Sequence, residues 1–165
     1  MFKNAVAWYN QSMNIKVKQA TIDDLGKWWD NEIRSNPHDT GLEWYKNLFI
    51  NDNASGDRIT FFAWDSDKII GQVTLIIRYD GKEVGDTVNK LEVEPEYRGK
   101  KVSSLLIKHI EQYAKSKGIN SLTIGVEPKE VRNLQIYFHW GFTNFVGIET
   151  DPKEKYPYLV YRKDL

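Results

Sequence analysis

The chain has 165 residues, of which 41% are hydrophobic and 28% charged, and its formal net charge is zero. This length and composition predict one soluble domain, and the balanced charge gives no basic surface for nucleic acid. The absence of cysteine excludes disulfides, thiolate metal sites and cysteine nucleophiles. Because no apolar run approaches a span of roughly 18–20 residues and the start lacks a signal-peptide pattern, we expect a cytoplasmic protein without membrane contact.

The first half of the chain predicts a strand, two helices and three further strands. Residues 14–20 alternate apolar and polar side chains, the pattern of a half-buried strand. Thr21 followed by Asp24 is typical of a helix N-terminus, and this helix is expected to end before Pro37. The remaining elements of this half are a helix at 42–50 and strands at 58–64, 68–79 and 86–93, with turns at 65–67 and 80–82.

The second half alternates helices and strands. Apolar residues recur with helical spacing over 102–117, and Gly118 suits the C-cap of that helix. The other elements are expected at 121–126 (strand), 129–140 (helix), 142–150 (strand) and 156–162 (strand). Strand–helix–strand units require parallel crossovers and hairpins require antiparallel pairs, so we expect a mixed, twisted sheet with helices on both faces.

The charged residues are unevenly distributed. Residues 19–57 contain eight acidic and three basic side chains, whereas residues 98–117 contain six basic side chains and one acidic. This pattern indicates either two solvated faces, or one region for cationic groups and another for anionic groups.

A basic turn joins the strand at 86–93 to the helix at 102–117. A helix N-terminus exposes unpaired N–H groups at the positive end of the helix dipole, and a glycine-containing loop before it can complete an anion cradle. Alone, the turn is equally compatible with a basic loop that starts a surface helix. The residues expected to hold phosphate groups are Arg98, Gly99, Lys100, Lys101, Val102, Ser103 and Ser104.

The segment LEVEPEYRGKKVSSLL, residues 91–106, resembles the acetyl-CoA motif of the GNAT N-acetyltransferases. That motif is written Arg/Gln-x-x-Gly-x-Gly/Ala after a strand that ends in Val-x-Pro. Arg98 matches, whereas Lys101 and Ser103 stand where glycine, and glycine or alanine, are usual.

The segment VEPKEVRNLQIYFHWGF, residues 126–142, is similar to the GNAT segment that follows the acetyl-CoA motif. Tyr137, Gly141 and Phe142 match in identity and spacing, whereas Glu130 and Asn133 replace the usual Asn and Ala. Two motifs in the right order, separated by a predicted helix and strand, are far more specific than either alone.

The resemblance implies an α/β (α+β) GNAT fold over residues 15–165, with residues 1–14 as an N-terminal extension. This fold is a mixed, mostly antiparallel twisted sheet of about seven strands, flanked by about four helices. The resemblance also implies acetyl-CoA as co-substrate and no metal, in keeping with three scattered histidines. Beyond the basic turn, the cofactor contacts that it implies are Leu91, Val93, Asn133 and Tyr137.

Acetyl transfer to an amine requires a neutral amine, a polarised carbonyl oxygen and a proton for the leaving thiolate. The resemblance implies that Tyr137 supplies the proton, as a phenol with a pKa near 10 can do; the alternative is a core tyrosine. It implies that a backbone N–H of the strand containing Leu91 and Val93 polarises the carbonyl, at a bulge that opens the sheet.

The general base is left open. Asn89 occupies the position where the family often has an acid or His, and it cannot take a proton near pH 7. Glu92 is a candidate, but strand alternation places it on the opposite face unless the bulge redirects it. Asp86 is a further candidate, and a water chain would need no dedicated base.

The acceptor is expected between the first two helices, the strand near Asn89 and the loop between the last strands. Trp28 and Trp29 are candidate substrate contacts, although a core role is favoured for these tryptophans. The acidic bias of 19–57 favours a small cationic amine as the acceptor. The alternatives are a protein N-terminus or lysine, or a non-catalytic acyl-CoA sensor of the same fold. A homodimer is compatible with such a domain.

Overall fold

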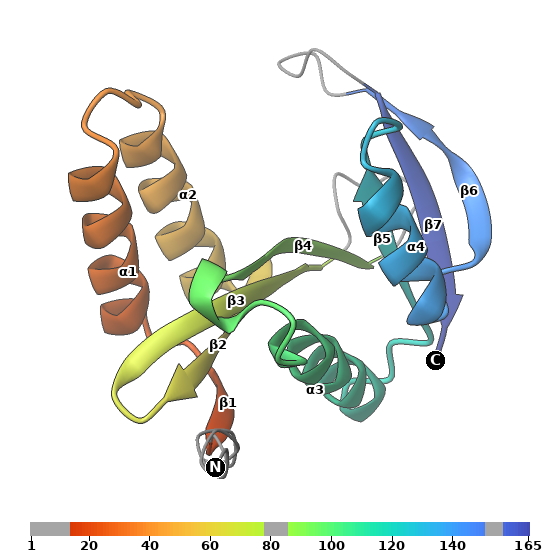
Figure 1. The fold of residues 1–165 in the computed structure, drawn as a ribbon, viewed down its shortest axis with the longest axis horizontal. Helices are drawn as coiled ribbons and strands as arrows, with labels where there is room; N and C mark the ends of the chain where they lie inside the picture. The colour runs from red at the N-terminus through yellow and green to blue at the C-terminus, as the bar shows by residue number, and fades with distance from the viewer. Residues whose placement is uncertain (1–13, 78–85, 151–156) are drawn as a thin grey trace, which may run out of the picture.

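The computed structural model describes residues 14–77, 86–150 and 157–165, which form a seven-stranded sheet with helices on both faces (Figure 1). The strands are β1 (Ile15–Gln19), β2 (Arg58–Asp65), β3 (Lys68–Ile76), β4 (Asp86–Val93), β5 (Ser121–Val126), β6 (Asn144–Glu149) and β7 (Tyr158–Asp164). The helices are α1 (Ile22–Ser35), α2 (Leu42–Ser55), α3 (Val102–Ser116) and α4 (Val131–His139), with a short 3-10 helix, η2 (Pro95–Tyr97), before α3. The predicted turn at 80–82, most of the loop between the last strands and all but the last residue of the extension at 1–14 lie outside the described residues.

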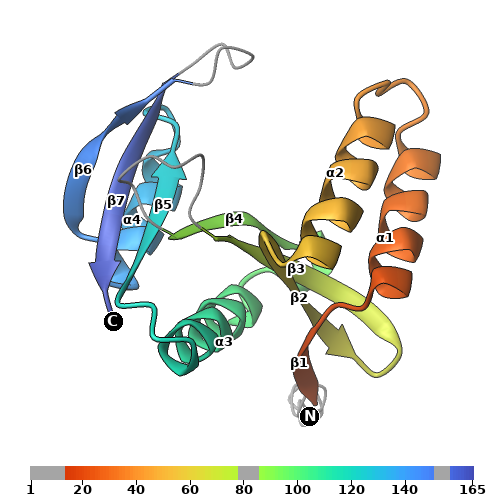
Figure 2. The ribbon, with the colours of Figure 1, turned by 180° about the vertical axis from the view of Figure 1, so that it is seen from behind.

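The strand order is β1-β2-β3-β4-β5-β7-β6, and all neighbouring strands pair antiparallel except β4 and β5, which pair parallel. The predicted mixed, mostly antiparallel sheet is therefore confirmed. Strand β7 lies between β5 and β6, with α4 beside these three strands (Figure 2).

Adjacent residues of β2 show how the helices divide between the two faces. The Phe62 ring contacts Trp28 of α1, with ring centroids 5.5 Å apart, whereas Phe61 contacts His109 and Tyr113 of α3. Because successive side chains of a strand point to opposite faces, α1 and α3 lie on opposite sides of the sheet (Figure 1). On the α3 side, buried side chains of the sheet, such as Leu75 of β3, pack against buried side chains of α3 to form the hydrophobic core.

Local signals account for several helix ends. The Thr21 hydroxyl accepts from the Asp24 N–H while the Asp24 carboxylate accepts from the Thr21 N–H, so α1 begins with the predicted N-cap, as a capping box. Gly118, just after α3, has a φ of 74°, the left-handed conformation that ends many helices. Helix α4 begins at Val131, two residues later than predicted.

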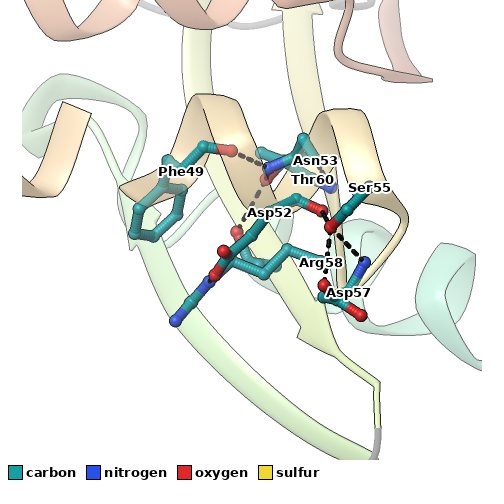
Figure 3. Close-up of polar contacts among 8 residues, drawn as sticks. Phe49, Asp52, Asn53, Ser55, Asp57, Arg58 and Thr60 are labelled. Atoms are coloured by element: carbon teal, nitrogen blue, oxygen red, sulfur yellow. Dashed lines mark hydrogen bonds and ion pairs between the residues drawn. The ribbon is translucent and has the colours of Figure 1, made fainter. Parts of the chain in front are cut away.

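Helix α2 runs to Ser55, five residues beyond the predicted end at residue 50. The Asn53 amide donates to the Phe49 carbonyl (2.8 Å) and its oxygen accepts from the Thr60 N–H of β2 (2.9 Å) (Figure 3). Arg58 and Asp52 form an ion pair of 2.6 Å beside them. The last turn is polar and is stabilised by contacts with β2, which hydrophobic spacing within the segment does not reveal.

Candidate active site

The parallel pair of β4 and β5 is short. Only Asp86, Thr87 and Val88 of β4 pair with β5, opposite Leu122 to Ile124, and beyond Val88 the two strands separate (Figure 1). Strand β3 remains paired with β4 on its other side as far as Val93. Among the strands that the structure describes, the backbone of β4 from residue 89 onward therefore has a partner on one edge only, and a free edge can pair with an extended ligand.

Strand β4 carries the bulge that the sequence resemblance implied. Thr74 of β3 lies opposite Asn89 and Gln72 lies opposite Glu92, so three steps along β4 face two along β3. Within this bulge Lys90 has a φ of 48°. The extra residue brings Asn89 and Glu92 to the same face, that of Gln72. The condition under which Glu92 was predicted to reach the substrate side is therefore met.

The basic turn leads into a helix that begins without a side-chain cap. Lys101 is the N-cap residue of α3 and has a left-handed φ of 64°, and Gly99 has a φ of 74°. Lys101 thus adopts the backbone conformation for which glycine is favoured, with its side chain exposed to solvent. The first turn of α3 has no acidic residue, so its N–H groups and its dipole are available to an anion.

The turn is anchored on both sides. The Arg98 Nε donates to the Val93 carbonyl at the end of β4, over 3.2 Å. The Tyr97 hydroxyl donates to Asp65 of the β2–β3 hairpin over 3.0 Å, and the Lys100 ammonium lies 5.0 Å from the centre of the Tyr97 ring. These contacts tie the predicted phosphate-binding residues to the end of the strand that carries the bulge.

Helix α4 brings the second motif to the first. Tyr137 stacks on Trp140, with ring centroids 6.0 Å apart, and the Trp140 indole N–H donates to the Ser104 hydroxyl in the first turn of α3 (3.3 Å). Burial, and then the nearby Glu130 carboxylate, raise the pKa of the Tyr137 phenol. The phenol therefore keeps its proton at neutral pH, as a proton donor must.

The two unusual residues of the second motif bond to each other. The Asn133 amide donates to the Glu130 carboxylate over 3.1 Å, across the start of α4. Of the predicted cofactor contacts on β4, Leu91 and Val93 pack against the core on the α3 side. Their side chains thus serve the core, and only their backbone groups face the unpaired edge.

A pocket of about 870 Å³ lies between α1, the β2–β3 hairpin and the end of β4. Trp28, Glu32 and Glu94 are among its lining residues. Two lysines also line it, but Lys27 pairs with Asp23 and Lys68 pairs with Glu96, so each is already neutralised by an acid outside the lining. The pocket consequently favours cationic groups.

The other residues that were predicted to contact the acceptor or to act as its base do not all lie at this pocket. Asn89 is exposed on the face of α1 and α2, the side expected for the acceptor. Trp29 is only 2% exposed and packs on Phe49, which places it in the core and does not support a contact with the acceptor. Asp86 lies at the end of β4 that is still paired with β5, three residues before the bulge at Asn89, so the structure does not bring it to the bulge.

Glu32 belongs to this region and was not singled out from the sequence. It is half-buried on α1, and burial, followed by the Glu92 and Glu94 carboxylates, raises its pKa. The signal available in the sequence was its spacing: Glu32 follows Trp28 by four residues, on the same face of an acid-rich helix.

Within residues 14–77, 86–150 and 157–165, no group of three or more His, Cys, Asp or Glu side chains is arranged to hold a metal ion. Within the same ranges, no helix has the length and apolar character needed to cross a membrane.

A family model described as the acetyltransferase (GNAT) family matches residues 22–142. No curated protein matches the chain in sequence. Three solved structures illustrate the similarity in fold. PaiA N-acetyltransferase from Thermoplasma acidophilum, in complex with coenzyme A, has a TM-score of 0.67 at 19% identity, covering 93% of this chain and 100% of its own.

The other two solved structures are of enzymes that, according to their names, acetylate an alanine of a ribosomal protein. The enzyme from Brucella melitensis has a TM-score of 0.68 at 16% identity, with 91% of this chain and 99% of its own covered. The Escherichia coli enzyme specific for ribosomal protein S18 has a TM-score of 0.68 at 15% identity, covering 91% and 93%. Since the family model spans most of the chain and the fold agrees, this protein belongs to the acetyltransferase (GNAT) family and is an N-acetyltransferase with acetyl-CoA as donor.

Proposed function

We propose that the chain transfers the acetyl group of acetyl-CoA to a primary amine of a small cationic molecule. One observation carries the donor half of this proposal: the unpaired edge of β4 beyond Val88 leads to the uncapped N-terminus of α3 at Lys101. Phosphate groups of coenzyme A would bind the N–H groups of the turn from Arg98 to Ser104, and the amides of its pantetheine arm would pair with β4.

The bulge and Tyr137 support roles at the reacting carbonyl. Within the proposal, a backbone N–H of the bulged segment of β4 polarises the thioester carbonyl while the amine nitrogen attacks its carbon. The C–N bond forms, the C–S bond breaks, and the leaving sulfur takes the proton of the Tyr137 phenol. The attacking nitrogen loses its remaining extra proton as the amide forms, and this proton, passed directly or through water, restores the phenol. The raised pKa of the half-buried Tyr137 phenol supports that role, because the group remains protonated until the thiolate forms.

The pocket supports a small cationic acceptor. Its volume of about 870 Å³ lies within the range of small-molecule sites, about 300–1,000 Å³. Its lining acids outnumber its lysines, and both lysines are paired. We propose a cytoplasmic location for this reaction, in keeping with a chain that contains no cysteine. A homodimer remains a prediction.

A protein N-terminus is the second candidate acceptor. It is favoured by the names of the two similar structures that acetylate a ribosomal-protein alanine. Acetylation of short peptides with a free N-terminal alanine, at a rate above that of simple diamines, would favour this candidate over a small molecule.

Titration calorimetry with acetyl-CoA tests the donor site. We expect binding in the micromolar range, and an absence of binding contradicts the proposal. Replacing Tyr137 with Phe should leave this binding intact and lower the turnover number by about 100-fold, within the usual range for a general acid. Tyr113→Phe, a phenol of α3 that packs on Phe61 in the core, is the matched control and should retain full turnover.

Binding without turnover against a panel of amines and peptides would instead indicate the non-catalytic sensor. Unchanged turnover in Tyr137→Phe would remove the proposed acid role and leave the donor site standing.

A further inference from the structure

Three carboxylates lie close enough to interact beside the bulge of β4: Glu32 of α1, Glu92 of β4 and Glu94, the residue after β4. Glu92 is held in place: it accepts from the buried Gln72 amide and from the Lys90 ammonium, each over 2.8 Å. Glu32 of α1 and Glu94 at the end of β4 have no hydrogen bond or ion pair through their carboxylates within the part of the chain that the structure describes. Both line the 870 Å³ pocket.

The surroundings of Glu32 differ from those of Glu92 in a way that matters for proton transfer. Glu32 is half-buried and faces Glu92, Glu94 and Lys90, all on or next to β4. Burial first, and then the two carboxylates, raise its pKa, against the opposing effect of the lysine. A carboxylate whose pKa lies closer to neutrality is a better general base, and Glu32 has no ion pair among the described residues, whereas Glu92 is paired with Lys90.

A buried amide next to Glu92 has an oxygen without a hydrogen-bond partner in the part of the chain that the structure describes. This amide belongs to Gln72, which is 1% exposed. The orientation of this amide is determined by its nitrogen, which donates to Glu92 and would be repelled by the carboxylate if it were replaced by the oxygen. An unpaired acceptor next to Glu92 requires a donor, and an ammonium group, directly or through a water molecule, brings donors.

We propose that Glu32 and Glu92 together bind the ammonium group of the acceptor, and that Glu32 is the general base that removes its proton. This inference rests on the proposed function and adds to it the residue that family resemblance left open at Asn89. The proton moves from the ammonium nitrogen to a Glu32 carboxylate oxygen, which leaves a neutral amine with a free lone pair. The amine then forms the C–N bond to the acetyl carbon, and the protonated Glu32 releases its proton to solvent through the pocket.

Steady-state kinetics with acetyl-CoA and 1,5-diaminopentane, followed as release of the coenzyme A thiol, test this role. At pH 7 we expect Glu32→Gln to lower kcat/KM by about 100-fold, the usual scale for a general base. The loss should shrink as the pH approaches the pKa of the free amine, which is about 10. At such a pH a large part of the acceptor arrives neutral and needs no base. A residue with only a structural role would show the same loss at every pH.

The matched control is Glu43→Gln, an exposed carboxylate on α2, which should keep the wild-type pH profile. Calorimetry should show that Glu32→Gln binds acetyl-CoA with unchanged affinity, which separates the acceptor side from the donor site. Equal pH profiles for Glu32→Gln and wild type overturn the role of Glu32 and leave the donor site standing. If wild-type protein binds acetyl-CoA but releases no thiol with the diamine, both the cationic acceptor and the base are wrong.

Thermal unfolding as a function of pH gives a second test that does not depend on activity. The pKa of Glu32 is raised in the folded state, so its contribution to stability is present below the unfolded pKa and is lost as the pH rises through the folded pKa. Glu32→Gln should therefore raise the Tm at pH 7 and lose this advantage in acid, near pH 3. A lower Tm at pH 7 in this variant would contradict the unfavourable burial of the charge that the proposal requires.

Discussion

Lys90 and Lys101 hold left-handed backbone conformations, with φ angles of 48° and 64°. For a residue with a Cβ this conformation costs about 1–2 kcal/mol, and both lysines lie where the cofactor is proposed to bind. At Lys90 the conformation accompanies the bulge that brings Glu92 to the same face as Gln72, and at Lys101 it begins α3. Strain that persists at such positions is consistent with a backbone geometry that the site needs.

Lys101→Gly tests this strain directly. Glycine adopts a positive φ without steric cost, so we expect the free energy of unfolding to rise by about 1 kcal/mol, measured by urea denaturation. Lys108→Gly, at an exposed position inside α3, is the control and should lose about 1 kcal/mol. Equal losses in both variants would show that Lys101 is not strained.

At the residue scale, the sequence allowed us to predict those candidate site residues that belong to a recognisable motif. Tyr137 and Arg98 were identified by the resemblance of their segments to the two GNAT motifs, and the structure brings α4 to the first turn of α3, just after the turn that contains Arg98, through Trp140 and Ser104. Lys90 carries no such signal, because a bulge depends on the pairing of β4 with β3. Glu32 was missed for a related reason: its raised pKa depends on Glu92, which is 60 positions away in the sequence.

Among the elements, α2 shows how tertiary hydrogen bonds extend a helix. Its last turn is held by Asn53, which bonds both to Phe49 within the helix and to Thr60 of β2 (Figure 3). The Thr60 hydroxyl continues the network to the Thr74 hydroxyl on β3, over 3.0 Å. Amphipathic spacing predicted the first part of α2 and failed for the polar last turn, because the partners of that turn lie on another element.

Asn53→Ala should destabilise the protein by about 1–3 kcal/mol, since it leaves the buried Thr60 N–H without an acceptor. Urea denaturation measures the change. Asn47→Ala, at an exposed position on the same helix, controls for helix propensity and should change stability by less than about 0.5 kcal/mol. A small effect at Asn53 would indicate that water replaces its amide.

At the scale of the whole molecule, β4 separates two sites. The turn at the start of α3 and Tyr137 of α4 are the residues proposed for the donor, whereas α1, which lines the pocket, lies on the other face of the sheet from α3. The order of elements along the chain was predicted correctly, because periodicity and turn residues are local. The insertion of β7 between β5 and β6 was not predicted, because it depends on pairing between distant segments, and the opening of the sheet beside β4 was implied only by the family resemblance.

Gly71 tests whether the two sides of β4 are coupled. A Cβ at this position would lie 2.9 Å from the Glu92 carbonyl oxygen and 3.3 Å from a Leu106 methyl group of α3. Neither the backbone of β4 nor the packed helix can yield without moving the other, so Gly71→Ala should displace β4 next to its bulge. We expect a loss of stability of about 1–3 kcal/mol from overpacking, and an acetyl-CoA Kd about tenfold higher, equivalent to about 1.4 kcal/mol.

Gly26→Ala is the matched control, because no heavy atom lies within 4 Å of its added Cβ. Alanine is favoured inside a helix, so this variant should gain about 0.5–1 kcal/mol and bind acetyl-CoA as the wild type does. Calorimetry and urea denaturation on the same samples separate the two effects. If Gly71→Ala loses stability but keeps its affinity for acetyl-CoA, the displacement is absorbed on the α3 side, and the edge of β4 that faces the donor is insulated from its packing.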